Sequence, residues 1–328
     1  MTIKQINTVT GSLPSDQLGT TLMHEHILYG YPGWEGDQTI APFDKKAIVE
    51  ATLPVFNQLK ELGLVSYVDA TPNDGGRCPE IYREVSEKTG INVICSTGYY
   101  YEGEGSAAYW KLRSSLNDIS EELYELFMTE ITIGIQGTGI KAGVIKIGAS
   151  KGEITDYEKM ILAAAARVQQ ETGVPIITHT QEGSMGPDQA TLLIEAGVDP
   201  KKIQIGHMSD NLDLEYQTDT FKKGVYVSWD RMGLQGLVGC PMDEQRYPVM
   251  IDLIKQGYAN QMMISHDFII NWLGRPLNIP EQFLPLIANW NPTHLFLNII
   301  PHLKENGVTD EQIQTIIKEN PRRLFEGS

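Results

Sequence analysis

Thr20-Thr21-Leu22-Met23-His24-Glu25-His26 is the stretch from which the architecture of this 328-residue chain can be worked out. Its apolar and β-branched residues predict a short strand. Successive side chains on a strand point to opposite faces, so His24 and His26 point the same way and Glu25 points away. Two imidazoles on one face can hold one metal ion. Two histidines in a core or a turn are the alternative, and the rest of the chain decides between the two.

Similar apolar segments recur along the chain and are separated by longer amphipathic stretches. Strands are predicted at residues 20–26, 64–70, 92–97, 143–148, 174–179, 203–207, 225–230 and 262–267. Helices are predicted at residues 44–62, with an interruption near Pro54, and at 79–89, 119–133, 155–172, 188–196, 212–223, 242–256 and 309–319.

The strict alternation of strands and helices implies a parallel sheet. Eight such units in a chain of this length favour a closed (β/α)8 TIM barrel of the α/β class over an open doubly wound sheet. No Gly-x-Gly-x-x-Gly follows a strand, which weakens a dinucleotide-binding fold. No change of composition marks a linker, so residues 1–328 are predicted to form a single domain.

The composition excludes several classes of function. Lys plus Arg is 26 and Asp plus Glu is 42, and the resulting net charge of −16 repels nucleic acid and anionic membranes. The three cysteines form no Cys-x-x-Cys pair and favour a reducing cytoplasm. The N-terminal residues lack the apolar core of a secretory signal, and no apolar run is long enough to cross a bilayer.

Polar residues that bind metals fall on the predicted strands, mostly at their carboxyl ends, where (β/α)8 enzymes carry their active sites. Taken singly, each has a structural alternative: a hydrogen-bonded histidine, a helix N-cap for Asp267, or a surface-directed amine for Lys146. A lysine directed into the barrel would, however, bury an unpaired ammonium. Their coincidence on five strands therefore favours a metal site. The six residues are His24, His26, Lys146, His179, His207 and Asp267.

This ordered set resembles the phosphotriesterase family of the amidohydrolase superfamily, and within it the lactonase branch. The resemblance extends over nearly the whole chain. Besides the six residues, it is carried by residues 134–138, 141–143, 177–179, 205–207, 230–231, 265–267 and 320–325.

The resemblance implies a centre of two divalent metal ions, zinc first, with cobalt, iron or manganese as alternatives. His24, His26 and Asp267 would hold the more buried ion, and His179 and His207 the more exposed one. Lys146, rather than the nearby Lys141, would be N6-carboxylated and would bridge both ions. A hydroxide that bridges the ions would attack the substrate carbonyl, with Asp267 carrying the proton toward the leaving oxygen.

The loops after the strands are expected to choose the substrate. By resemblance, Tyr100 lies beside the metals and Arg231 shapes the lactonase pocket. Their structural alternatives are an aromatic wall residue for Tyr100 and, for Arg231, a salt bridge with a barrel-rim acid such as Asp230. Residues 268–290, which include Trp272 and Trp290, are expected to form an apolar flap.

The expected substrates are acyl-homoserine lactones or other hydrophobic lactones, with promiscuous turnover of phosphotriesters and aryl esters. Residues 180–186 and 208–211 depart from the acyl-homoserine lactonases and look more like members that open sugar lactones, some phosphorylated. In residues 228–230, the bulky Trp229 could reshape that wall of the pocket. A sugar lactonase and a phosphotriesterase proper are therefore kept as alternatives. A phosphate site would need cations near the mouth, and the candidates are Lys151, Arg231 and Arg275.

Two other classes compete with a hydrolase. A metal-dependent isomerase or aldolase on the same barrel would need only one ion and no carboxylated lysine. A non-catalytic barrel with structural metals is disfavoured because all six positions are intact. The family suggests a homodimer.

Overall fold

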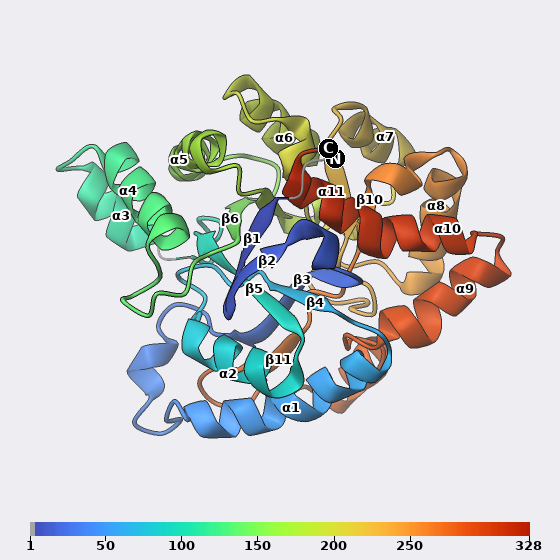
Figure 1. Cartoon of the computed structure of the whole chain (residues 1–328), viewed down its shortest axis with the longest axis horizontal. Helices are drawn as coiled ribbons and strands as arrows, with labels where there is room; N and C mark the ends of the chain where they lie inside the picture. The colour runs from blue at the N-terminus through green and yellow to red at the C-terminus, as the bar shows by residue number, and fades with distance from the viewer. Residues whose placement is uncertain (1–3, 106) are drawn as a thin grey trace.

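The computed structural model describes residues 4–105 and 107–328, and it confirms the (β/α)8 barrel (Figure 1). One parallel sheet has the order β10-β9-β8-β7-β6-β5-β4-β3-β11. Its strands are β3 (Thr21–Tyr29), β4 (Ser66–Asp69), β5 (Asn92–Gly98), β6 (Val144–Ala149), β7 (Ile176–Thr180), β8 (Ile203–Ile205), β9 (Tyr226–Trp229), β10 (Met262–Ile264) and β11 (Ile269–Trp272). All eight predicted strands are present, several of them a few residues shorter than expected.

Helices surround the central strands (Figure 1). They are α1 (Lys45–Glu61), α2 (Pro79–Thr89), α3 (Ala107–Ser114), α4 (Ile119–Thr132), α5 (Asp156–Thr172), α6 (Gly186–Glu195), α7 (Leu214–Lys222), α8 (Asp243–Lys255), α9 (Ile300–Glu305), α10 (Asp310–Gln314) and α11 (Asn320–Glu326). Residues 309–319, predicted as one helix, form α10 and a π-helical segment, η9 (Thr315–Glu319).

The predicted interruption of α1 at Pro54 is wrong, because the helix runs through it. Pro54 is exposed, and the carbonyl that loses its intrahelical partner can be hydrated there. Helix α5 follows its sequence signals: Thr155 and Glu158 form a capping box, and Gly173 ends the helix in the left-handed conformation.

Strand eight of the barrel is split, which the sequence did not predict. Its first part, β10, pairs with β9, whereas its second part, β11, pairs with β3, and residues 265–268 separate the two parts. Asp267 lies in this break with a left-handed backbone (φ 53°). The predicted strand at 262–267 therefore ends early, and the barrel is closed by the second part of a broken strand.

An N-terminal hairpin that the sequence did not predict covers the amino end of the barrel. It consists of the antiparallel strands β1 (Gln5–Thr8) and β2 (Gly11–Pro14), and it lies in front of the barrel strands in Figure 1. Ile6 of the hairpin and Leu324 and Phe325 of α11 belong to an apolar cluster with inward-facing strand residues such as Val144 and Ile177. This end of the barrel is thus filled with apolar side chains, and the polar site lies at the opposite end.

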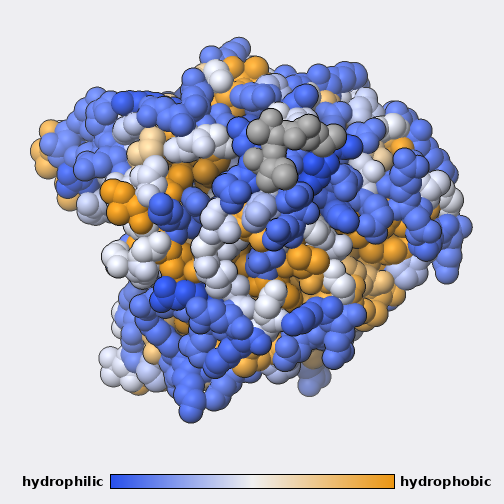
Figure 2. Space-filling view, in the orientation of Figure 1, coloured by the Kyte–Doolittle hydropathy of each residue, from blue (hydrophilic) through white to orange (hydrophobic). Residues whose placement is uncertain are grey.

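The face that carries the hairpin is largely hydrophilic (Figure 2), in keeping with the net charge of −16. Within the described residues, no helix is long and apolar enough to cross a bilayer.

Candidate metal centre

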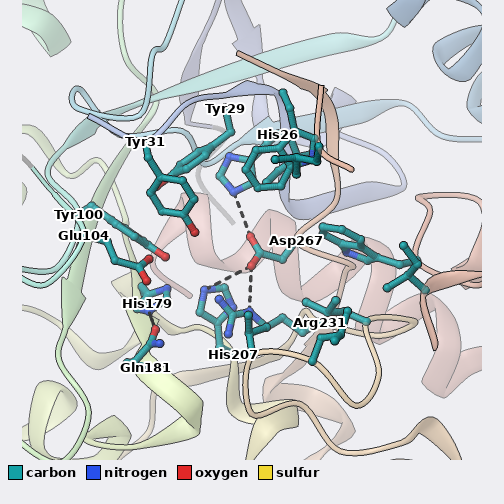
Figure 3. Close-up of a pocket in the computed structure, with 18 of the residues that line it drawn as sticks. His26, Tyr29, Tyr31, Tyr100, Glu104, His179, Gln181, His207, Arg231 and Asp267 are labelled. Atoms are coloured by element: carbon teal, nitrogen blue, oxygen red, sulfur yellow. Dashed lines mark hydrogen bonds and ion pairs between the residues drawn. The ribbon is translucent and has the colours of Figure 1, made fainter. Parts of the chain in front are cut away.

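Three predicted metal-binding histidines, His24, His26 and His207, converge on the carboxylate of Asp267, and Figure 3 shows His26 and His207 beside it. Asp267 Oδ1 lies 3.0 Å from His26 Nε2 and 3.5 Å from His24 Nε2. Its Oδ2 lies 3.8 Å from His207 Nε2. His24 and His26 come from β3, as predicted, and His207 follows β8 in a left-handed backbone conformation. One ligand atom each of His24, His207 and Asp267 lies within 4.8 Å of the others, a spacing compatible with metal binding.

Lys146 is buried in the middle of β6 and points into the same cluster. Its Nζ lies 2.7 Å from His24 Nε2. Burial lowers the pKa of Lys146 to about 8, although the negative charges of Asp267 and Asp230 act in the opposite direction. About a tenth of this amine is therefore neutral at pH 7, and the neutral amine is the form that can react with carbon dioxide.

His179 supplies the clearest test of whether metal ions fit here. It is fully buried at the end of β7, and its Nε2 lies 2.8 Å from Gln181 Oε1. Its Nδ1 is also buried but has no hydrogen-bond partner. A buried polar atom without a partner is costly, and a bound cation would satisfy it. The ring packs against the aromatic side chains of Tyr100 and Tyr101, at centroid distances of 4.8 and 5.0 Å.

The protonation states of these side chains suit metal binding. Burial lowers the pKa values of His24, His179 and His207 below their ordinary value, so their imidazoles are neutral at neutral pH. Burial raises the pKa of Asp267, but the neighbouring His207 and Arg231 outweigh burial and hold that pKa well below its usual range. Neutral imidazoles beside an ionised carboxylate are the forms that bind divalent cations.

Asp230 orients two of the histidines, a role that sequence reasoning missed. This fully buried carboxylate follows β9, with Oδ2 3.0 Å from His24 Nδ1 and Oδ1 2.9 Å from His207 Nδ1. Both rings consequently turn their Nε2 atoms toward Asp267. A carboxylate behind a ligating imidazole fixes its tautomer and orientation. The available signal was that Asp230, like the predicted ligands, ends a barrel strand.

Arg231 forms ion pairs with acids at the barrel rim, as its structural alternative expected, but its partners are Asp267 and Asp210 rather than Asp230, the acid named as an example. Its Nε donates to Asp267 Oδ2 at 2.9 Å, and its Nη1 donates to Asp210 Oδ2 at 3.0 Å. Asp210 also accepts a hydrogen bond from the buried Arg246 at 3.1 Å. The predicted site residue is therefore in place, but it holds Asp267 from the side. Asp210 and Arg246 were not identified from the sequence.

A cavity of about 280 Å³ opens above this cluster. Lys146, His26, His179, His207 and Asp267 lie at its polar end. Its other walls are mainly apolar and come from the segments after β9 and β10, including the expected flap. These wall residues are Leu234, Leu237, Val238, Ile269, Trp272, Leu277, Ile279, Ile287 and Trp290.

Tyr100 lines this cavity next to His179, where the sequence placed it (Figure 3). Burial raises the pKa of Tyr100 well above its ordinary value, so its hydroxyl stays protonated and can donate a hydrogen bond. Its backbone N–H donates to Asp74 Oδ1 at 3.1 Å. Tyr31 and Glu104 also line the cavity, and the sequence had singled out neither.

The three candidate cations for a phosphate site do not converge. Lys151 pairs with Glu182 at 2.5 Å, and Arg275 pairs with Asp37 at 2.7 Å. Neither belongs to the lining of the cavity. Arg231 does, but two carboxylates already neutralise it.

Comparison with known proteins agrees with this geometry. The model of the phosphotriesterase family matches residues 4–325. The chain is 35% identical to an aryldialkylphosphatase of Saccharolobus solfataricus over 317 residues, or 96% of this chain and 97% of that protein. An organophosphorus hydrolase from Deinococcus radiodurans superposes with a TM-score of 0.97 at 51% identity, over 98% and 96% of the two chains. A variant of a PTE-like lactonase from the same organism superposes with a TM-score of 0.96 at 49% identity, over 98% of this chain and 99% of that chain.

Proposed function

The chain belongs to the phosphotriesterase family, and from that premise we propose that it is a binuclear-metal-dependent hydrolase that opens hydrophobic lactones. Its family and relatives make it a hydrolase of ester bonds. The observation that carries the proposal is the unpartnered Nδ1 of His179 among neutral imidazoles, an ionised carboxylate and a buried amine.

In this proposal, His24, His26 and Asp267 hold one ion, and His179 and His207 hold the other. Lys146 would be N6-carboxylated and would contribute to holding both ions, because a carbamate would convert a poorly accommodated buried amine into an anionic oxygen ligand. When bound, divalent ions polarise the substrate carbonyl and make water a nucleophile near neutral pH.

The protein's own side chains complete the chemistry. Asp267 is ionised at neutral pH and can accept a proton and pass it to the leaving oxygen. Arg231 fixes the orientation of that carboxylate through its 2.9 Å hydrogen bond. The protonated hydroxyl of Tyr100 is available as a donor to an oxygen of the substrate. In a lactone the leaving oxygen remains tethered, so the product is a hydroxy acid.

The cavity favours a neutral, hydrophobic substrate. Its apolar walls suit the alkyl chain of a lactone such as an acyl-homoserine lactone, which would make this a quorum-quenching enzyme. Glu104 at the cavity adds a negative charge, and the candidate phosphate cations are paired with acids. A phosphorylated sugar lactone is therefore the less favoured substrate. Phosphotriesters, neutral and hydrophobic, would be turned over promiscuously.

A lactone panel followed with a pH indicator tests the substrate class. We expect kcat/KM for long-chain alkyl or acyl lactones to exceed that for phosphorylated sugar lactones and for a dialkyl aryl phosphate by at least about tenfold, or ~1.4 kcal/mol. Preferred hydrolysis of the phosphorylated lactone would reassign the substrate, and no lactone turnover by metal-loaded protein would reject the proposal.

Metal analysis tests the centre itself. The active protein is expected to contain two divalent ions per chain, and chelation should abolish turnover until metal is restored. Elemental analysis of desalted, active protein is the measurement. One ion per chain in fully active protein would favour the isomerase or aldolase alternative.

Carboxylation of Lys146 predicts a pH dependence for rebuilding the centre. With a pKa of about 8, half of this amine is neutral at pH 8, but only about 3% is neutral at pH 6.5. At equal dissolved carbon dioxide, metal-free protein should therefore regain activity at least about tenfold more slowly at pH 6.5 than at pH 8. Equal rates, independent of carbon dioxide, would contradict the carbamate.

Removal of the Tyr100 hydroxyl tests its contact with the substrate. Tyr100→Phe keeps the ring against His179 and should lower kcat/KM for lactones by about tenfold, the effect of losing one hydrogen bond of ~1.4 kcal/mol. Steady-state kinetics at equal metal content provides the check. Tyr99→Phe is the matched control, since Tyr99 precedes Tyr100 and packs against Trp110. An unchanged kcat/KM would leave Tyr100 as a wall residue.

A further inference from the structure

Glu25, the residue between the two histidines of β3, makes an unusual set of contacts across the closure of the barrel. Its side chain is completely buried. One carboxylate oxygen accepts a hydrogen bond from the backbone N–H of His266 at 2.9 Å and lies 2.7 Å from His266 Nδ1. The other accepts a hydrogen bond from the backbone N–H of Phe268 at 2.9 Å. One carboxylate therefore holds both neighbours of Asp267.

Asp267 needs such support because its backbone is left-handed. A residue with a Cβ pays a steric cost in this conformation, although Asp tolerates it better than most residues do. Two backbone hydrogen bonds add to the carboxylate contacts: Asp267 N–H donates to the His24 carbonyl at 3.1 Å, and His26 N–H donates to the Phe268 carbonyl at 2.9 Å. Through these hydrogen bonds, His24, Glu25 and His26 of strand β3 are connected to the break in strand eight. His24 and His26 are two of the predicted metal ligands.

His266 is fixed as a neutral donor toward Glu25. Its Nε2 accepts a hydrogen bond from the backbone N–H of Leu295 at 3.0 Å, so the ring proton belongs on Nδ1, which faces Glu25. Its carbonyl accepts a hydrogen bond from Trp290 Nε1 at 2.9 Å. Glu25 consequently meets three N–H donors and no acceptor, an arrangement that a carboxylate satisfies and a neutral substitute of the same shape does not. Burial raises the pKa of this carboxyl group well above its ordinary value, and the N–H groups of Phe268 and His266 act in the opposite direction.

We propose that Glu25 is a positioning residue that sets the place of the Asp267 carboxylate and thereby the retention of metal at the centre. It contacts the residues on both sides of Asp267, whereas its own carboxylate points away from the cavity. Glu25 also lies between His24 and His26. One residue therefore aligns these two ligands, which come early in the chain, with Asp267, which comes late. This inference rests on the proposed metal-dependent function.

Glu25→Gln is the primary variant because the amide keeps the size of the side chain. Its NH2 group can only donate, so at least one of the three N–H groups is left facing a donor. Glu25→Asp keeps the charge but shortens the reach, and it should recover part of the effect. Glu158→Gln is the matched control. Glu158 is also a buried carboxylate with three donors: Glu102 N–H at 3.0 Å, Ser150 Oγ at 2.6 Å and Thr155 N–H at 2.8 Å.

Two measurements separate positioning from general destabilisation. The first is the rate at which zinc-loaded protein loses zinc to excess EDTA. We expect Glu25→Gln to release zinc at least tenfold faster than the wild type, within the range seen for residues that orient metal ligands. The rate of zinc release from Glu25→Asp should lie between the rates of the wild type and of Glu25→Gln. The rate from Glu158→Gln should stay within about threefold of the wild type. The second is amide hydrogen exchange of residues 265–269 in metal-free protein, which should accelerate in Glu25→Gln and not in Glu158→Gln.

The outcomes are distinct. Zinc release from Glu25→Gln within threefold of the wild type, or equally faster release from Glu158→Gln, would overturn the proposal. If Glu25→Gln does not fold, the zinc-release rates of Glu25→Asp and Glu158→Gln are compared instead. The proposal then requires that Glu25→Asp release zinc faster than both the wild type and Glu158→Gln. A wild type that binds no zinc or other divalent ion would reject the proposed function instead. The exchange measurement on metal-free protein would still decide whether Glu25 holds residues 265–269.

Discussion

Lys146→Ala is expected to lose both metal ions and all measurable lactone turnover. The variant removes the side chain that, as a carbamate, would contact both ions. Elemental analysis and lactone hydrolysis on the same preparation are the measurements. Added short carboxylates such as propionate should restore part of both metal content and activity, because they supply a bridging carboxylate in the space left by the side chain. Full activity in Lys146→Ala would refute the carbamate assignment.

Two further variants separate metal loss from misfolding. Lys146→Met fills the same buried space without a charge, and we expect metal-free Lys146→Met to be at least as stable as the metal-free wild type, because burying an amine is unfavourable. It should nevertheless hold no metal. Lys141→Ala changes an exposed lysine near β6, and it should leave metal content and turnover unchanged. If metal-free Lys146→Met unfolds at a much lower temperature than the metal-free wild type, the amine has a structural role.

Asp267→Asn is expected to lower kcat for lactones by about a hundredfold or more, the range for loss of a proton-transfer group. Asparagine keeps the shape and one oxygen ligand but cannot accept a proton. It also keeps the left-handed backbone, because Asn tolerates this conformation as well as Asp does. Steady-state kinetics should be paired with metal analysis of the same sample, since metal loss would produce the same fall in rate.

Arg231→Ala provides the comparison for Asp267→Asn. It removes the 2.9 Å hydrogen bond to Asp267 but leaves the carboxylate in place, so the fall in kcat should be smaller. Arg231→Ala should change the relative kcat/KM of different lactones more than it changes kcat, because Arg231 also lines the cavity. An Asp267→Asn variant with both ions and near-normal turnover would leave Asp267 as a structural ligand only.

The barrel could be predicted because the signals for its strands and helices lie within short stretches of the sequence. Each strand is an apolar, β-branched segment, and signals such as the Thr155–Glu158 capping box mark where a helix begins. The convergence of the six candidate residues could also be predicted, since strand ends of a parallel barrel meet at one rim. Asp230 and Asp210 could not be assigned to their partners, because strand periodicity gives the direction of a side chain but not which of several neighbours it meets.

The split of strand eight was beyond sequence reasoning for a different reason. The sequence predicts one strand at residues 262–267 and assigns residues 268–272 to the flap, so it does not indicate that the strand ends at Ile264 and resumes at Ile269. The break is determined by hydrogen bonds to residues 23–26, which are more than 240 positions away. Pro54 shows the opposite case, in which a local helix-breaking signal is overridden because the residue lies on the solvent side of α1.

The split of strand eight also bears on the order of events during synthesis. His24 and His26 emerge from the ribosome long before Asp267, and about 240 residues must be made before the three can meet. Pairing over so long a loop is slow to form and is not available to a nascent chain. The proposed site for the more buried ion could therefore be assembled only after nearly the whole polypeptide has been made, so metal uptake would be a late step. Tight zinc binding would then report a completed barrel, and truncated or stalled chains would not sequester metal in this way.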